Sequence, residues 1–275
     1  MIEIPEAQVL SRQLRETLDG KTIVRAVAAA SPHGYTWYFG EPSSYPERLE
    51  GRQITGSAAH GGQAELWAED TRVVFSDGVN LRYYAPGEKR PARHQLLVVF
   101  DDESAICCTV QMYGGLLAFE AGTNSNPLYV GALVKPSPLS NDFTKEYFES
   151  LVDDRAARLP AKLFLATQQR IPGLGNGVLQ DILWQAKIHP KRTMFTLSEA
   201  EMDALHAAIR SVLTQMTAEG GRSVERDLFG KAGGYQTVMC RLTFDTACPR
   251  CGAPIQRLEY RGGTVYVCSN CQKLH

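Results

Sequence analysis

The hydrophobic positions follow different periods in the two halves of the chain. In residues 6–18, Leu10, Leu14 and Leu18 recur every four residues and an Asp-Gly pair follows, which predicts one helix. Residues 22–119 instead hold short β-prone runs between Gly, Pro and Asp turn signals. This alternation is typical of a sandwich or barrel, so a mainly β region is expected after the first helix.

A turn-rich stretch then separates this region from helical sequence. Residues 121–141 are rich in Gly, Pro, Ser and Asn and are interpreted as a linker, with a domain boundary near Lys135. Ser198 and Glu201 form a capping-box pattern ahead of an apolar stripe that indicates a buried helix face. Helices are predicted at residues 144–152, 161–168, 177–186 and 198–218.

Composition indicates a globular chain kept in a reducing compartment. The 275 residues are 44% hydrophobic, with no apolar run near the about 20 residues of a membrane-spanning helix and no signal-peptide pattern at the start. Seven cysteines, an odd number, favour reduced thiols over a disulfide framework. A cytoplasmic location without a membrane partner is therefore expected.

Charge differs between the two halves of the chain. Residues 155–275 hold 16 Lys and Arg against 9 Asp and Glu, a net charge of +7, whereas residues 1–154 have a net charge of −8. Lys and Arg supply most non-specific affinity for nucleic acid, so the C-terminal half is the candidate for contact with a polyanion. The alternative is an ordinary solvated surface.

The last stretch holds two Cys-x-x-Cys pairs separated by sixteen residues. Two such turns can supply four thiolates, which predicts one structural zinc ion with no open coordination position, held by Cys248, Cys251, Cys268 and Cys271. Two disulfides or four ordinary buried cysteines are the alternative. Residues 255–267 between the pairs predict two strands joined at residues 261–263, with Arg257 or Arg261 near the tip, where either suits phosphate contact.

A glycine-rich turn, residues 173–175, precedes the helix predicted at 177–186. Free backbone N–H groups and the positive helix end meet there, which makes an anion site. No strong strand precedes the turn and no acidic residue stands where a dinucleotide-binding fold needs one, so no nucleotide cofactor is expected.

The glycine turn is followed by a short helix, the sequence IHPKR at 188–192, a second, long helix and the four-cysteine hairpin. Together these features resemble the formamidopyrimidine-DNA glycosylase and endonuclease VIII family over essentially the whole chain. The resemblance implies an α+β fold and damaged double-stranded DNA, held between two domains, as partner. It implies that Asn176 grips a backbone phosphate, with Lys162 in the matching helix before it and the zinc hairpin on the strand. The expected domains are a helix with a β-sandwich over 1–134, a helix-two-turn-helix domain over 135–246 and a zinc finger over 247–275.

The resemblance also locates the catalytic end of the chain. Family members open with Met-Pro-Glu-Leu-Pro-Glu, and after methionine removal the proline nitrogen attacks the sugar carbon with help from the first Glu. Here Glu3 and Glu6 are kept, but Ile2 replaces the proline. Methionine removal normally needs a small second residue, so Met1 is expected to stay, with its amine one residue from the family position.

Three roles follow for these residues. The Met1 amine is a candidate nucleophile if deprotonated. Glu3 and Glu6 alternatively activate water for direct hydrolysis of the bond between base and sugar. In the third interpretation both carboxylates only cap the first helix.

Three further positions depart from the family pattern. His60 aligns with a phosphate-binding lysine, and Met112 and Tyr113 align with an Arg-Phe loop that fills the gap left by an extruded base. The hairpin arginine of the family falls at Gly263, two residues after Arg261. His60 is a candidate phosphate contact and Met112 or Tyr113 a candidate wedge, against the alternative of a remodelled surface.

Three functions are compatible with these residues. The leading hypothesis is a zinc-containing DNA-repair glycosylase with Glu3, Glu6 and Met1 at its catalytic site and a candidate abasic-site lyase activity. The second is a catalytically silent DNA-binding or lesion-sensing protein of the same fold, favoured by Ile2. The third, an RNA- or ribosome-associated protein, leaves the retained Glu3 and Glu6 without a role.

Overall fold

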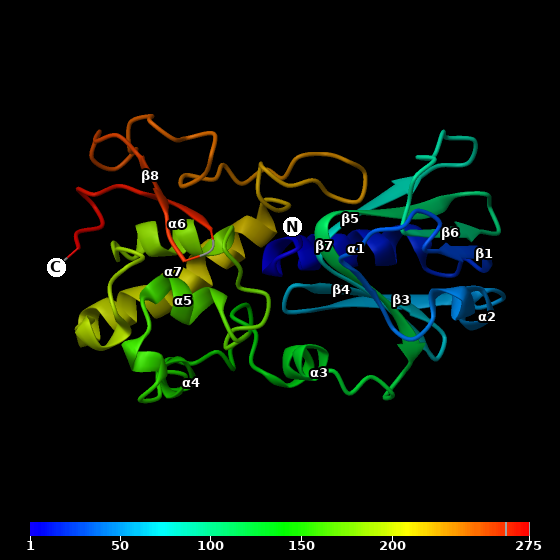
Figure 1. Ribbon diagram of the computed structural model, residues 1–275, viewed down its shortest axis with the longest axis horizontal. Coiled ribbons are helices and arrows are strands. Elements are labelled where there is room, and N and C mark those ends of the chain that lie inside the picture. The colour runs from blue at the N-terminus through cyan, green and yellow to red at the C-terminus, as the bar shows by residue number, and fades with distance from the viewer. Residues whose placement is uncertain (262, 275) are drawn as a thin grey trace.

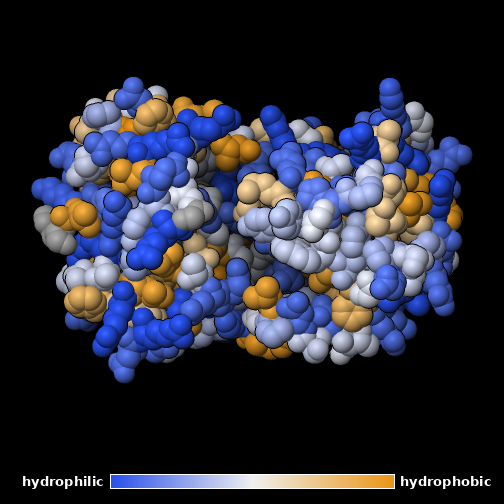
Figure 2. Space-filling view, viewed as in Figure 1, coloured by the Kyte–Doolittle hydropathy of each residue, from blue (hydrophilic) through white to orange (hydrophobic). Residues whose placement is uncertain are grey.

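The computed structural model describes residues 1–261 and 263–274. It shows two lobes, one built mainly of strands and one mainly of helices, and the N-terminus lies where they meet (Figure 1). The space-filling view shows a hollow between the lobes on the same face (Figure 2). The α+β fold class predicted from the sequence is confirmed.

The N-terminal lobe is a β-sandwich made by one seven-stranded sheet that folds over itself. The first half of β5 pairs with β4 and with the end of β7, and its second half pairs with the start of β7, which also pairs with β6. The register of β5 shifts between Asp77 and Val79, where the sheet turns from one layer to the other. The strands are β1 Ile23–Ala28, β2 Thr36–Tyr38, β3 Ile54–His60, β4 Gln63–Ala68, β5 Thr71–Tyr84, β6 Leu96–Phe100 and β7 Ala105–Glu120.

Helix α1, Ile4–Leu18, places the start of the chain at the junction. The capping-box bonds between Glu3 and Glu6 begin the helix, and Pro5 suits its first turn. Leu10, Leu14 and Leu18 are all buried against the strands, so the helix predicted over residues 6–18 is confirmed and begins two residues earlier.

Residues 121–141, interpreted from the sequence as a linker, contain a helix that was not predicted. Helix α3, Pro127–Val134, forms inside this stretch. Asn126 caps it by accepting a hydrogen bond from the backbone nitrogen of Leu128, and Pro127 provides a pre-set first turn. The turn-forming residues therefore mark the start of a short helix.

The C-terminal lobe packs its helices around the long helix α7. The Ser198 and Glu201 capping box is present at its start. Each predicted helix of this lobe is found within two residues of its expected limits. The helices are α4 Lys145–Ser150, α5 Ala161–Ala166, α6 Val178–Gln185 and α7 Glu199–Ala218, and the short α2, Tyr45–Leu49, lies in the other lobe.

Two segments after α7 complete the molecule. Residues 220–237 return to the N-terminal lobe, where Leu228 is buried in the first core and its carbonyl accepts a hydrogen bond from the backbone nitrogen of Tyr83. Strands β8, Gln256–Glu259, and β9, Thr264–Val267, form the predicted hairpin. Its expected turn at residues 261–263 includes Gly262, which lies outside the described residues. No helix in the described part of the chain has the length and apolar character to cross a membrane.

Candidate functional site

The backbone at Ile2 is fixed against the β-sheet. Its N–H donates a 2.6 Å hydrogen bond to the carbonyl of Asp77, and the two residues form an isolated β-bridge. The Ile2 side chain is buried in the core of the N-terminal lobe. The lone pair of a peptide nitrogen is delocalised into the adjoining carbonyl, so position 2 offers no nucleophile.

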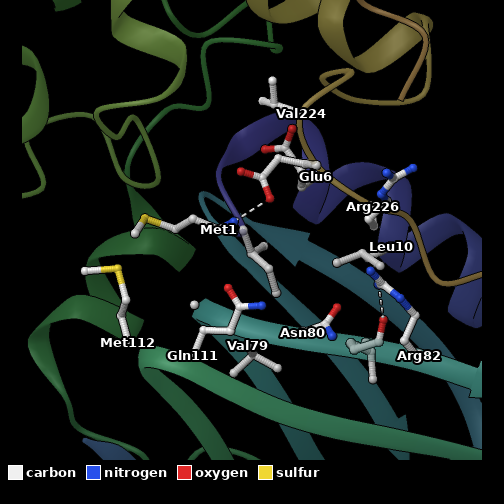
Figure 3. A pocket seen from close by; sticks show the side chains of 14 residues that line it. Met1, Glu6, Leu10, Val79, Asn80, Arg82, Gln111, Met112, Val224 and Arg226 are labelled. Atoms are coloured by element: carbon white, nitrogen blue, oxygen red, sulfur yellow. Dashed lines mark hydrogen bonds and ion pairs between the residues drawn. The ribbon is translucent and has the colours of Figure 1, made fainter. Parts of the chain in front are cut away.

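Met1 lines a cavity of about 280 Å³. Its nitrogen lies 2.6 Å from Oε2 of Glu225. Figure 3 shows Met1, Glu6 and Val224 on one side of the cavity and Asn80 and Gln111 on the strands opposite. The cavity therefore joins the N-terminus, β5, β7 and the segment after α7.

Arg222 is a buried cation that contacts three residues at the start of the chain. Its Nε and Nη2 atoms lie 2.9 and 2.8 Å from the two carboxylate oxygens of Glu6, and Nη1 lies 3.6 Å from Oε2 of Glu3. Nη2 also donates to the carbonyl of Met1 at 3.3 Å. Burial alone would lower the pKa of Arg222, but the two carboxylates raise it above its ordinary value. No sequence signal points to Arg222, because one arginine in an irregular segment has no periodicity or motif.

Glu3 links the start of α1 to the start of α6. Its carboxylate accepts hydrogen bonds from the backbone nitrogens of Gly177 and Val178 at 2.9 and 2.8 Å. The position favours a negative charge, because it is the positive end of a helix. Burial nevertheless raises the pKa of Glu3 above 4.5, against the lowering effect of Arg222.

The glycine turn is shaped for this close approach. A Cβ atom on Gly177 would lie 1.7 Å from Nη1 of Arg222, and one on Gly175 would lie 2.7 Å from Oε1 of Glu3. The turn between β3 and β4 meets it from the other lobe, because a Cβ atom on Gly173 would lie 1.9 Å from the nitrogen of Gly62. The expected anion site at the start of α6 is thus filled by the carboxylate of Glu3.

Glu6 has the contacts expected of a helix cap. One of its oxygens accepts from the backbone nitrogen of Glu3 at 3.3 Å, and the other accepts from the backbone nitrogen of Arg222 at 3.2 Å. Glu6 also lines the cavity beside Met1. It is both a structural acid and a neighbour of the amine.

A second cluster joins α5, the glycine turn and the four-cysteine hairpin. Asn176 donates from Nδ2 to the carbonyl of Thr264 at 3.1 Å, while its buried Oδ1 has no hydrogen-bond partner among the described residues. Lys162 donates to the carbonyls of Tyr260 and Gly263. The structure therefore brings Asn176 and Lys162 together at the hairpin tip, where Arg261 is exposed.

His60 lies apart from this cluster, at the end of β3. Its Nε2 atom is 3.7 Å from Oε1 of the buried Glu65, which also accepts a 2.6 Å hydrogen bond from the hydroxyl of Tyr129. The imidazole is one-quarter exposed and points toward a carboxylate. This arrangement agrees with the remodelled surface more closely than with a phosphate contact.

Met112 and Tyr113 lie on β7 beside the cavity. Met112 lines the cavity and is 66% exposed, the state expected of an apolar wedge before it meets a ligand. The Tyr113 ring lies 5.8 Å from the ring of Trp37, which is also half-exposed. Trp37 was not singled out from the sequence, because only the parallel pairing of β2 with β7 brings it here.

The four hairpin cysteines converge as predicted. Their four sulfur atoms all lie within 4.8 Å of one another, and the Cys251 and Cys268 sulfurs are 3.4 Å apart. A tetrahedral zinc site with Zn–S bonds of about 2.3 Å places its sulfurs about 3.8 Å apart, so the donor set fits. Trp184 donates from Nε1 to the sulfur of Cys248, as an outer-sphere partner of a thiolate would.

Comparison with known proteins gives consistent matches along the chain. The family model for the formamidopyrimidine-DNA glycosylase H2TH domain matches residues 134–227. Proteins named formamidopyrimidine-DNA glycosylase from Lactobacillus delbrueckii and Deinococcus radiodurans are each 29% identical, with 99% and 100% of this chain and 100% and 98% of theirs covered.

Solved structures show the same fold. A Lactococcus lactis Fpg bound to DNA with an abasic site has a TM-score of 0.85 at 24% identity, and the alignment covers 99% of this chain and all of that one. The Lactococcus lactis Fpg (MutM) complex with DNA containing N7-benzyl-Fapy-dG has the same TM-score and coverage at 25% identity.

Proposed function

The chain belongs to the formamidopyrimidine-DNA glycosylase family, and on that premise we propose that it binds damaged duplex DNA and releases the damaged base from its sugar. The observation that carries the catalytic part is the position of the Met1 amine, which faces a cavity beside the retained Glu6. Access to the sugar carbon requires the nucleotide to leave the stack.

In this proposal Met1 replaces the missing proline as the nucleophile. An α-amine attacks carbon only when it is deprotonated, so the Met1 ammonium must first lose a proton. Formation of a Schiff base would also permit a later lyase step at the abasic site. Glu3 assists by holding the start of α1, and with it Met1, against the start of α6.

The second cluster would hold the DNA backbone. Asn176, Lys162 and Arg261 come from three different segments that meet at the hairpin tip, where Arg261 is exposed and Lys162 is only 4% exposed. The zinc hairpin positions two of these contacts, because β9 and the tip accept the hydrogen bonds of Asn176 and Lys162.

We assign the metal as zinc because four thiolates match its preferred ligand set. His60 is the weakest of the proposed contacts, since it faces Glu65. A protein acting on DNA with no membrane-spanning helix in its described part fits the cytoplasm.

The test is turnover on defined duplexes. The purified chain is incubated with duplexes carrying an abasic site or oxidised bases, and base release and strand nicking are measured separately. Glu3→Gln removes the buried acid, and Glu16→Gln, on the exposed face of α1, is the matched control. Activity in the wild type and in Glu16→Gln that is lost in Glu3→Gln supports the glycosylase.

A second candidate function rests on Ile2. Its bonded amide removes the nucleophile at the family position, which would leave a lesion-sensing protein if the Met1 amine does not act. Tight binding to damaged duplexes with no turnover on any of them would favour this alternative.

A further inference from the structure

Glu225 reaches from the segment after α7 back to the start of the chain. One carboxylate oxygen lies 2.6 Å from the Met1 nitrogen, and the other lies 3.8 Å from Nη2 of Arg222. The Glu225 side chain is 27% exposed, whereas those of Glu3 and Glu6 are only 4% and 6% exposed. Glu225 is therefore the acid at this site that contacts both the amine and the open cavity.

The buried carboxylates of Glu3 and Glu6 already accept hydrogen bonds from other parts of the chain. The Glu3 oxygens accept from Gly177 and Val178, and those of Glu6 accept from Arg222. A carboxylate that accepts a proton must give up or share such bonds, which destabilises the buried network around Arg222. Glu225 can accept a proton without breaking the contacts between α1 and α6.

We propose that Glu225 is the proton acceptor for the Met1 amine when that amine attacks the sugar, and that Arg222 is the residue that positions both. The inference rests on the proposed function, because it names the base in that reaction. Arg222 binds the carbonyl of Met1 and lies beside Glu225, so the amine and its acceptor are held by one buried cation.

Met1 is an ammonium paired with Glu225, so a first proton passes from the Met1 nitrogen to the Glu225 carboxylate. The amine lone pair then forms the bond to C1′ while the bond from C1′ to the base breaks. The electron pair of that bond leaves with the base, which takes up the first proton from Glu225 through water and so returns Glu225 to its carboxylate form. The nitrogen now bonded to C1′ carries a surplus proton, which passes to the Glu225 carboxylate. Opening of the sugar ring moves the C1′–O4′ electron pair to O4′, which takes up this proton, and the remaining iminium is reducible by borohydride.

The experiment is borohydride trapping on an abasic duplex, which forms the adduct without prior base release. Intact mass first establishes that the chain begins with the Met1 amine, and peptide mapping then locates the adduct. The variants are Glu225→Gln, Glu225→Ala and Glu225→Asp, with Glu16→Gln as control. DNA affinity is measured for each variant, since a proton acceptor changes the trapping rate and leaves binding in place.

We expect the adduct on Met1 and a trapping rate reduced about 100-fold in Glu225→Gln, the scale of general base catalysis. Glu225→Asp should recover part of the rate, and added formate should recover part of it in Glu225→Ala, which a purely structural role would not permit. Glu16→Gln should trap as the wild type does.

Three results would overturn the inference: normal trapping in Glu225→Gln, an adduct on a residue other than Met1, or no adduct with the wild type. Base release without an adduct overturns it while leaving the proposed glycosylase intact. An adduct on Met1 that depends on Glu225, without release of any damaged base, would support the inference and contradict the glycosylase activity.

Discussion

The Nζ atom of Lys162 lies 3.5 Å from the point where a Cβ atom on Gly263 would stand. At this hairpin position the family resemblance places an arginine, and the chain has no side chain there. The Lys162 ammonium reaches the same space from α5, with Nδ2 of Asn176 3.9 Å from the same point. A cation is thus restored beside Asn176 from a different element.

Lys162→Met should weaken binding to a duplex with an abasic site, because it removes this cation and keeps most of the aliphatic stem. The slope of log affinity against log salt concentration should fall by about 1, the change expected for one lost phosphate contact. Titrations at several salt concentrations measure it, with Lys89→Met, on an exposed loop far from the hairpin, as control.

Gly263→Arg in the Lys162→Met background should recover both affinity and salt slope, since it returns the cation from the hairpin side. An unchanged slope in Lys162→Met would show that this lysine serves only to anchor the hairpin carbonyls.

Arg222→Met should destabilise the protein strongly. The change leaves Glu3 and Glu6 buried without their cation, and loss of one partner of a buried ion pair costs about 3–5 kcal/mol. Urea denaturation followed by circular dichroism gives the change in unfolding free energy. Arg226→Met, in the same segment but without this network, should change it by much less. Equal effects of the two would contradict the assigned role of Arg222.

Features made by residues close together in the sequence could be predicted, whereas contacts between residues far apart in the sequence could not. The capping box of α7 and the four cysteines lie within short windows, so pattern alone located them. Arg222 could not be found in this way, because its partners lie about 216 residues earlier and only the return of its segment to the N-terminal lobe brings them together. The placements of His60 and Trp37 likewise depend on strand pairing. The resemblance supplied Asn176, and the structure added that its amide contacts β9.

The buried state of Glu3 predicts a pH dependence of stability. Its folded pKa is raised above 4.5 by burial, so protonation is easier in the folded than in the unfolded chain. Its favourable contribution is complete below about pH 4.5 and is lost as pH rises through the folded pKa. Glu3→Gln cannot ionise, so its stability relative to the wild type should improve across that window. Denaturation midpoints of both proteins between about pH 4 and 8 measure this, and a relative stability that stays constant with pH would contradict the raised pKa.

Metal removal should unfold the hairpin and leave the rest of the fold intact. Cys248→Ser deletes one ligand, and the metal content should fall from one equivalent to near zero, because four thiolates complete the site. The hairpin core is small and includes Cys248 and Cys268 themselves, so it should lose its fixed structure without the ion. DNA affinity should then drop, since the partners of Lys162 and Asn176 lie on β9 and at the tip.

The Met1 cavity lies away from the hairpin, so borohydride trapping at saturating DNA should persist in Cys248→Ser. Metal analysis, affinity and trapping on the same preparation test this, with Cys240→Ser as the control for loss of a thiol, and a loss of trapping at saturation would show that the two clusters are coupled.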